Sequence, residues 1–590
     1  MLVFLRLKVP RTGKSSRMRA LQLVAVLLAA VSCGNDHAPT QATVASARLP
    51  IGTNLDALNY YTPMLPTLDL MKSSDRWIPQ HDGVWDSNEP VPLDADGWVT
   101  RLPGPGDGLR YTRVNLVLLY DNLASPPPDT RFVVLYTGTG TFGGGLDTTI
   151  VSSQPGRLVI RSGASKTLSL HLTETDPAGT GDYVRDIRVV REDMLPRYTA
   201  GQTFNPDLVA KLAPFTTVRF MDWMNTNEIF DTAGEPITSD AAQRAAPSLL
   251  WRHRPQVSNR QWGNRGMPVE KMVEFANLTG LNPWFNMPIN ASDEYVRNFA
   301  AYVRDNLRRD LKVRVELSNE VWNFAFPQSR YAEAKAIAIW GRGANWMEWY
   351  GMRAAQVGGI WNSVFREPST GDGDPKRVIV VYNTQFGWRG LEDHGLETEH
   401  WRGSKGNRIR AADYFDEYAI TGYIGGVMDQ ESQVAKVMSW WRDADGGYAR
   451  AIAALRDDVA SDLAPGYAYH AGKARQHALN LTTYESGYAE TTPYSQHQNQ
   501  RFTDFLANVQ RRPEMQQLYT ENLGAFRNAG GTLFMSFGLI NTPSKWGSWA
   551  VLENINQTTS PRYRALVDWA ASNNPPKAEG ATAVQISDSQ

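Results

Sequence analysis

An α/β fold, a closed (β/α)8 TIM barrel with a small β-sandwich inserted after its first strand, is predicted by three observations. After residue 199, seven apolar strand candidates alternate with helical stretches, and residues 51–54 supply an eighth. Residues 81–198 instead carry short β-type runs separated by turn-forming clusters. The composition, 42% hydrophobic and 21% charged, excludes wholesale disorder and collagen-like repeats. Strands alternating with helices favour a parallel sheet covered by helices, and eight such units favour closure into a barrel.

The predicted barrel comprises residues 51–80 and 199–575. Its later strand candidates lie at 218–221, 282–286, 313–317, 378–382, 418–423, 479–484 and 532–537. Helical spacing of apolar residues follows the early ones, at 269–278, 294–307 and 329–339. An open doubly wound sheet is the alternative, but no G-x-G-x-x-G turn follows any strand candidate to support a nucleotide site.

The predicted insertion, residues 81–198, has the pattern of an antiparallel sandwich. Its β-type runs lie at 114–120, 131–136, 157–160, 167–172 and 187–190. Short strands at this spacing, with Gly- and Asp-rich turns between them, are typical of such a sheet pair. Its role stays open between binding sugar and buttressing the barrel.

The first 33 residues have the pattern of an export signal. Six basic residues between positions 6 and 19 precede an apolar run at 20–31, too short for a spanning helix of about 20 residues. The segment Ala30-Val31-Ser32-Cys33 resembles a bacterial lipobox, which implies lipidation of Cys33 and an exported envelope lipoprotein, in the periplasm or at the outer membrane. The alternative is a plain secreted protein cleaved near Ala30 or Ser32. A flexible tether is expected at 34–50 and a disordered tail at 576–590.

Charge and residue counts limit the classes of partner. The 60 Lys and Arg against 61 Asp and Glu leave a net charge of −1, which offers no broad basic field for nucleic acid. Contact with a membrane is expected only through the lipid anchor. The single cysteine excludes a disulfide framework and a Cys-based zinc site within one chain, and the nine histidines show no metal-binding spacing, so no metal or cofactor is expected. The 19 Trp and 23 Tyr are typical of proteins that hold sugar rings, the alternative being that they fill cores.

Two carboxylates directly follow apolar strand candidates. Glu320 lies in Ser318-Asn319-Glu320 after the fourth strand, and Glu485 lies in Tyr484-Glu485 at the end of the seventh. In a (β/α)8 barrel these positions face the mouth, where the chemistry takes place. Glycoside hydrolysis needs two such groups, one to protonate the leaving oxygen and one to meet the developing oxocarbenium carbon. The alternative is that both are solvated or salt-bridged carboxylates.

At these motifs the sequence resembles the clan of retaining glycoside hydrolases with a (β/α)8 barrel that contains the family 5 cellulases and mannanases. The clan's signature is Asn-Glu at the end of strand four and a lone Glu at the end of strand seven. Asn319-Glu320 and Glu485 match it in identity and in strand number. The resemblance, which covers the barrel alone, implies that Glu320 is the acid/base, Glu485 the nucleophile, and Asn319 a hydrogen-bond partner of the sugar 2-hydroxyl.

The same resemblance suggests further binding residues. The clan places an Arg on strand two and a Tyr near strand six against the nucleophile, where Arg219 and Tyr423 stand in this chain. A Trp after strand eight usually floors the cleavage subsite, and Trp546 and Trp549 are the candidates here. Asn383, after strand five, is a further candidate for binding sugar, with loop packing as the alternative.

Two functions are therefore compared. The first is a retaining glycoside hydrolase that cleaves β-glycosidic bonds of a polysaccharide or oligosaccharide by double displacement, with long loops and many aromatics indicating endo action. In this enzyme Glu485 is ionised beside Arg219 and Tyr423, and Glu320 is protonated because it is less cation-paired. The alternative is a non-catalytic carbohydrate-binding surface protein, which has no need for Asn319 beside Glu320.

Overall fold

The barrel predicted from the sequence is confirmed by a computed structural model, which describes residues 48–120, 124, 126–367 and 374–574. One parallel sheet has the strand order β15-β14-β13-β12-β11-β10-β1-β16. A parallel bridge between Thr482 and Leu533 joins its two edges, so the sheet is nearly closed. The strands are β1 (Ile51–Asn54), β10 (Thr217–Arg219), β11 (Asn282–Met287), β12 (Val313–Leu317), β13 (Val378–Asn383), β14 (Glu417–Ile424), β15 (Asn480–Tyr488) and β16 (Phe534–Ser536).

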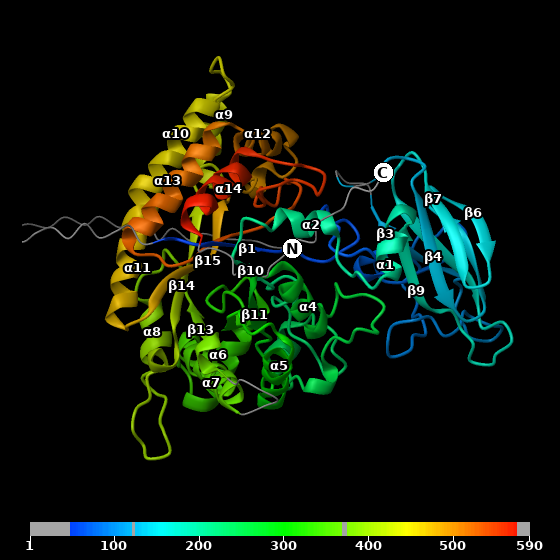
Figure 1. Cartoon of the computed structure of the whole chain (residues 1–590), viewed down its shortest axis with the longest axis horizontal. Helices are drawn as coiled ribbons and strands as arrows, with labels where there is room; N and C mark the ends of the chain where they lie inside the picture. Colours follow the sequence, from blue (N-terminus) through cyan, green and yellow to red (C-terminus); the bar gives the residue numbers. More distant parts are fainter. Residues whose placement is uncertain (1–47, 121–123, 125, 368–373, 575–590) are drawn as a thin grey trace, which may run out of the picture.

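Helices follow the barrel strands along the chain and surround the sheet (Figure 1). Among the described residues, none of these helices combines the length and the apolar character needed to cross a membrane. The helices are α1 (Leu195–Thr199), α2 (Pro206–Lys211), α3 (Asp240–Arg244), α4 (Val269–Thr279), α5 (Asp293–Asn306), α6 (Pro327–Trp340), α7 (Trp346–Arg366), α8 (Leu391–Glu397), α9 (Val434–Trp440), α10 (Tyr448–Asp458), α11 (Ala464–Gln476), α12 (Gln500–Gln510), α13 (Glu514–Ala529) and α14 (Pro561–Asn573).

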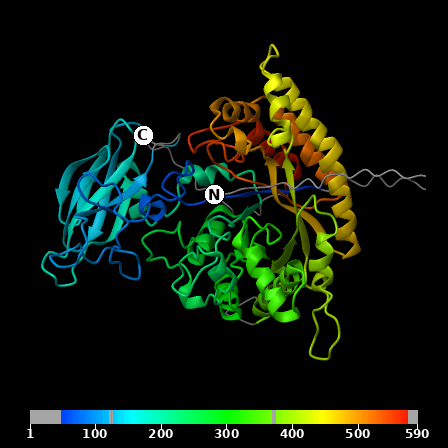
Figure 2. The same cartoon turned by 180° about the vertical axis from the view of Figure 1, so that it is seen from behind.

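Between β1 and β10 the chain forms two antiparallel sheets, in the orders β2-β3-β8-β5 and β6-β7-β4-β9. They lie beside the barrel, at one end of the long axis of the molecule (Figures 1 and 2). One hydrophobic cluster contains side chains from both sheets, among them Leu116 and Val134. The strands are β2 (Ile78–Gln80), β3 (Arg113–Leu119), β4 (Arg131–Thr137), β5 (Gly140–Gly145), β6 (Thr148–Gln154), β7 (Arg157–Ser162), β8 (Leu168–Thr175) and β9 (Arg185–Arg191). β2 precedes residue 81, so this sheet begins earlier than the predicted insertion.

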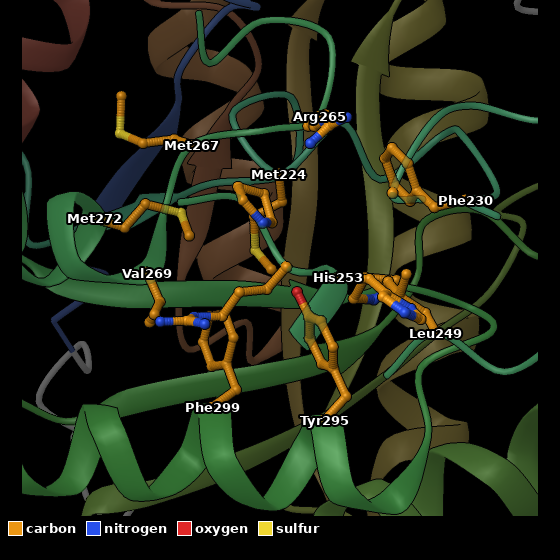
Figure 3. A pocket seen from close by; sticks show the side chains of 14 residues that line it. Met224, Phe230, Leu249, His253, Arg265, Met267, Val269, Met272, Tyr295 and Phe299 are labelled. Atoms are coloured by element: carbon orange, nitrogen blue, oxygen red, sulfur yellow. The ribbon is translucent and has the colours of Figure 1, made fainter. Parts of the chain in front are cut away.

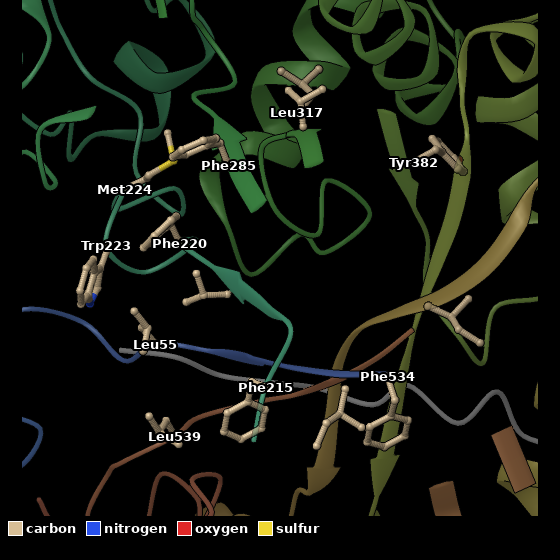
Figure 4. Close-up of a cluster of buried hydrophobic side chains, with 14 of the residues drawn as sticks. Leu55, Phe215, Phe220, Trp223, Met224, Phe285, Leu317, Tyr382, Phe534 and Leu539 are labelled. Atoms are coloured by element: carbon tan, nitrogen blue, oxygen red, sulfur yellow. The ribbon is translucent and has the colours of Figure 1, made fainter. Parts of the chain in front are cut away.

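The barrel strands present alternate residues to two different cores, as strand geometry requires. Phe220 and Phe285 point outward and stack at 5.5 Å between ring centroids, within the large cluster that joins strands to helices (Figure 4). Trp284 and Met535 belong to a separate cluster inside the barrel. Arg219 also points inward, which places a cation in the barrel at the level of the carboxylates described below.

Several sequence predictions fall outside the described residues. These are the signal segment with the lipidation site Cys33, most of the tether and all of the C-terminal tail. They stay predictions.

Candidate active site

The segment after β12 has a strained backbone. Ser318 and Glu320 have φ angles of 60° and 41°, in the left-handed region that costs a non-glycine residue about 1–3 kcal/mol. The buried Gln328 side chain, at the start of α6, donates from Nε2 to the carbonyl oxygen of Asn319 at 2.7 Å and so braces the turn. Backbone strain of this kind concentrates at functional sites, and here it lies on both sides of Asn319.

Glu320 is buried and accepts hydrogen bonds from neutral donors. Tyr484 Oη donates to its Oε1 at 3.0 Å, and Asn323 Nδ2 donates to its Oε2 at 2.9 Å. Burial, and then the negative charge of Glu485, raise the pKa of Glu320 to about 8. The Glu320 carboxyl is therefore protonated at neutral pH, the state that a proton donor requires.

Glu485 is also buried, but it faces a cation. Arg219 Nη1 donates to its Oε1 at 2.9 Å, and Tyr423 Oη donates to its Oε2 at 2.6 Å. Burial raises the pKa of Glu485, while the charge of Arg219 and the hydrogen bond from Tyr423 oppose that rise. The two carboxyls interact electrostatically, and the guanidinium favours Glu485 as the one that ionises.

A β-bulge explains how two neighbouring residues of β15 both reach partners inside the barrel. The register between β14 and β15 shifts after Ile420, which pairs with Thr483, so that Thr421 pairs with Glu485 and Tyr484 is left over. In a regular strand Tyr484 and Glu485 would point to opposite faces. The extra residue removes this alternation locally, so Tyr484 reaches Glu320 while Glu485 reaches Arg219.

Arg219 links Glu485 to a third buried carboxylate, Glu316 of β12. Its Nη2 lies 2.9 Å from both carboxylate oxygens of Glu316, and its Nε lies 3.0 Å from Oε2. Asn286 Nδ2 and Trp284 Nε1 also donate to Glu316, at 2.7 and 2.8 Å. Arg219 and both carboxylates are fully buried, so the guanidinium is held in one orientation beneath Glu485.

Arg219→Met is expected to destabilise the fold by about 3–5 kcal/mol, because it leaves two buried carboxylates without their cation. Urea unfolding followed by circular dichroism measures this loss. Arg161→Met is the matched control: Arg161 pairs with Asp129 on the surface, with 45% of its side chain exposed, so a change below about 1 kcal/mol is expected. Equal effects of the two substitutions would contradict the assigned role of Arg219.

Asn319 and Asn383, the two asparagines predicted to bind sugar, lie at different depths in the barrel. Asn319 accepts from Arg219 Nη2 at 3.0 Å and donates from Nδ2 to Asn227 Oδ1 at 3.0 Å, level with the carboxylate pair. Asn383 is fully buried and donates to Glu316. Its amide therefore orients Glu316 instead of facing the pocket, which differs from the sugar-binding role predicted for Asn383.

An open pocket of about 50 Å³ adjoins Glu320 of the carboxylate pair. Trp549 forms part of its wall and packs edge-on against Tyr423, with 5.5 Å between ring centroids. Trp546 does not line this pocket; its ring is 38% exposed and packs against His497. The pocket is lined by Glu320, Trp322, Asn323, Gln385, Thr421, Tyr423, Gly425, Gly426, Asp429, Ala489 and Trp549.

Sequence reasoning missed Glu316, Asn323 and Tyr484. Glu316 had a detectable signal, since Arg314 and Glu316 stand two residues apart in an otherwise apolar strand and must share its inner face. Buried charges are rare unless paired, and both are paired, Arg314 with Glu417 at 2.8 Å and Glu316 with Arg219.

A second cavity lies under the loop that follows β10 (Figure 3). Its walls are mostly apolar, including Met224, Phe230 and Phe299, and its volume of about 20 Å³ has room for about one water molecule. The two arginines in its lining are both paired, Arg254 with Glu270 and Arg265 with Glu235. This cavity is unsuited to a substrate. Among the described residues, no group of three or more His, Cys, Asp or Glu is arranged to hold a metal ion.

No protein-family model and no curated protein matches the chain. Among solved structures it is similar to a GH5-4 broad-specificity endoglucanase from Clostridium acetobutylicum, with 11% identity, 60% of this chain and 98% of that chain covered, and a TM-score of 0.30. It is also similar to the catalytic domain of a GH26 endo-β-1,4-mannanase from Bacillus sp. JAMB-750 (12% identity, 52% and 69% covered, TM-score 0.28). A third similar structure is xylanase 10B from Thermotoga maritima (10% identity, 60% and 98% covered, TM-score 0.28). At these identities the chemistry of the site rests on this chain's own residues.

Proposed function

We propose that the protein is a retaining glycoside hydrolase acting on β-linked polysaccharides or oligosaccharides. The observation that carries the proposal is a pair of buried carboxyls in opposite environments, Glu320 in the turn after β12 and Glu485 within β15. Glu320 accepts only from neutral donors in the contacts described above, whereas Glu485 is bound by the Arg219 guanidinium. Two carboxyls held in different protonation states are what a double displacement uses.

In the first step the Glu485 carboxylate attacks the anomeric carbon as the glycosidic bond breaks, and Glu320 gives its proton to the departing oxygen. The sugar is then bound to Glu485 as an ester. Because this removes the negative charge that raises the pKa of Glu320, Glu320 becomes the stronger acid and is left as a carboxylate. It then takes a proton from water, which attacks the same carbon and releases Glu485.

The pocket supplies groups suited to a sugar. The Trp549 indole offers a flat face, and Asn319 lies beside the pair with its amide already oriented by Arg219 and Asn227. Export and anchoring through a lipid on Cys33 belong to this proposal, because a polymer is degraded outside the cell. Radiolabelled palmitate incorporation that is lost in Cys33→Ser tests the anchor.

The test is release of reducing ends from a panel of β-glucans, mannans, xylans and bacterial exopolysaccharides, with the anomeric configuration of the first product followed by NMR. Release with retained configuration is expected. Inverted product would refute double displacement. Binding to a polymer without release from any of them would favour the carbohydrate-binding alternative.

The value of kcat/KM is expected to follow a bell-shaped pH profile whose alkaline limb has an apparent pKa of about 8, because Glu320 must be protonated in the free enzyme. The acidic limb reports the ionisation of Glu485. Tyr484→Phe removes a hydrogen bond that favours ionised Glu320, so the alkaline limb should move to higher pH. If the alkaline limb does not move in Tyr484→Phe, then that limb does not report the ionisation of Glu320.

A further inference from the structure

A ridge of aromatic side chains lies on the loops beside the catalytic pocket. It consists of Phe324, Trp346 and Trp388, here called the aromatic ridge. The Phe324 and Trp346 ring centroids are 5.0 Å apart, and those of Trp346 and Trp388 are 5.9 Å apart. Phe324 is 43% and Trp388 46% exposed. Large apolar side chains that contact one another at the surface are typical of a binding surface.

One end of the ridge continues the loop that carries Glu320. Trp322, two residues after Glu320, lines the pocket, and the partly exposed Phe324 follows two residues later. Trp346 is fixed to the same loop, because its Nε1 donates to the carbonyl oxygen of Val321 at 3.0 Å. The ridge and the proton donor are therefore held on one structural unit.

The other end of the ridge is tied to a second loop that lines the pocket. The backbone N–H of Trp388 donates to Oε1 of Gln385, and Gln385, like Glu320, lines the pocket. The loops after β12 and β13 thus both run from the pocket to the ridge.

The position of the ridge also indicates on which side of the scissile bond it lies. A general acid must lie beside the oxygen of the leaving group. The leaving-group part of the bound substrate therefore lies along the loop that carries Glu320. Phe324 and Trp346 are fixed to that loop. The ridge is therefore on the leaving-group side of the scissile bond.

We propose that the aromatic ridge binds the leaving-group side of an unbranched, β-linked polysaccharide chain and makes the enzyme endo-acting. This inference rests on the proposed hydrolase function. Pyranose rings with equatorial linkages expose flat C–H faces, which stack on aromatic rings, whereas branches on the chain would prevent that stacking. The adjacent Arg389 lies over the ring of Tyr469, with 4.8 Å from its guanidinium carbon to the ring centroid, and so points away from the ridge.

The test compares two substrates, the polysaccharide that the wild type degrades best and a nitrophenyl glycoside whose leaving group is too short to reach the ridge. For Trp388→Ala the ratio of kcat/KM on the polymer to that on the aryl glycoside is expected to fall about tenfold, mainly through KM. Trp388→Phe, which keeps a ring, should recover most of it. Trp85→Ala is the control, because Trp85 is 50% exposed but lies in the segment between β2 and β3.

A further readout separates endo action from tight binding alone. Wild type should lower the viscosity of the polymer faster per reducing end released than Trp388→Ala or Phe324→Ala does. An unchanged substrate ratio and an unchanged viscosity curve in both variants would overturn the ridge while leaving the hydrolase intact. If the wild type cleaves neither substrate, the proposed function fails. Affinity electrophoresis in a gel that contains the polysaccharide then tests whether the ridge binds it, by comparing Glu320→Gln with and without Trp388→Ala. If the polysaccharide retards both proteins equally, the proposed role of the ridge is wrong.

Discussion

Glu485→Gln is expected to lower kcat/KM by more than about 10⁴-fold on every substrate, because the residue that forms the covalent bond is removed. The substitution keeps the side-chain shape: the amide oxygen can still accept from Arg219, and the amide NH2 can donate to the hydroxyl oxygen of Tyr423, so the fold should persist. Initial rates on the best polymer and on an aryl glycoside measure the loss. An aryl glycoside with an excellent leaving group should be affected as strongly as the polymer, since leaving-group quality cannot replace a nucleophile.

Chemical rescue makes this prediction specific to a nucleophile. Glu485→Gly leaves space for azide, which should restore part of the rate on an activated aryl glycoside and give the glycosyl azide of inverted configuration. Glu417→Gln is the matched control, because Glu417 is another buried barrel carboxylate that is paired with Arg314, whereas Glu485 is paired with Arg219. It should lower stability and leave cleavage in place. If rescue yielded the azide of retained configuration, Glu485 would not be the nucleophile.

The positions of Glu320 and Glu485 were predictable because the topology of a parallel barrel is simple. Every strand ends at the same rim, so a carboxylate directly after an apolar run must face the mouth. Strand order alone did not select Arg219 and Tyr423, which lie at or near the ends of their own strands; the resemblance to the hydrolase clan suggested them.

The bulge at Tyr484 was not predictable from the sequence. β15 carries no proline or internal glycine before Glu485 that would mark an extra residue, so regular alternation predicts that Tyr484 points away from the pocket. The bulge depends on pairing with β14, a contact between distant parts of the chain. It supplies the tyrosine that holds Glu320, which single-strand patterns cannot reveal.

The orientation of the Asn383 side chain differs from the one predicted from the sequence. A polar residue after an apolar run was expected to face the sugar, but β13 extends to Asn383 and its side chain points into the barrel toward Glu316. One residue of difference in strand length changes which layer of the barrel a side chain enters. Trp546 and Trp549 also differ in orientation, because the loop after β16 turns only Trp549 toward Tyr423.

Glu320→Ala is expected to lower kcat/KM on a polysaccharide by about 10³–10⁴-fold, because a poor leaving group then departs without a proton. A dinitrophenyl glycoside needs no protonation, so its covalent intermediate should still form and then accumulate, since the base for the second step is missing. Burst kinetics measure this. Azide should speed the second step and give the retained glycosyl azide, the opposite anomer to that from the Glu485 variant.

The comparison between leaving groups decides what Glu320 does. A purely structural role would lower activity on polymer and dinitrophenyl glycoside alike, whereas an acid/base loses far more on the polymer. Glu392→Gln is the control, because Glu392 is fully buried and bonded to Tyr469 but does not line the pocket. Equal losses on both substrates in Glu320→Ala, with no burst and no azide effect, would leave the carboxyl as a structural group and remove the proton donor on which the double displacement depends.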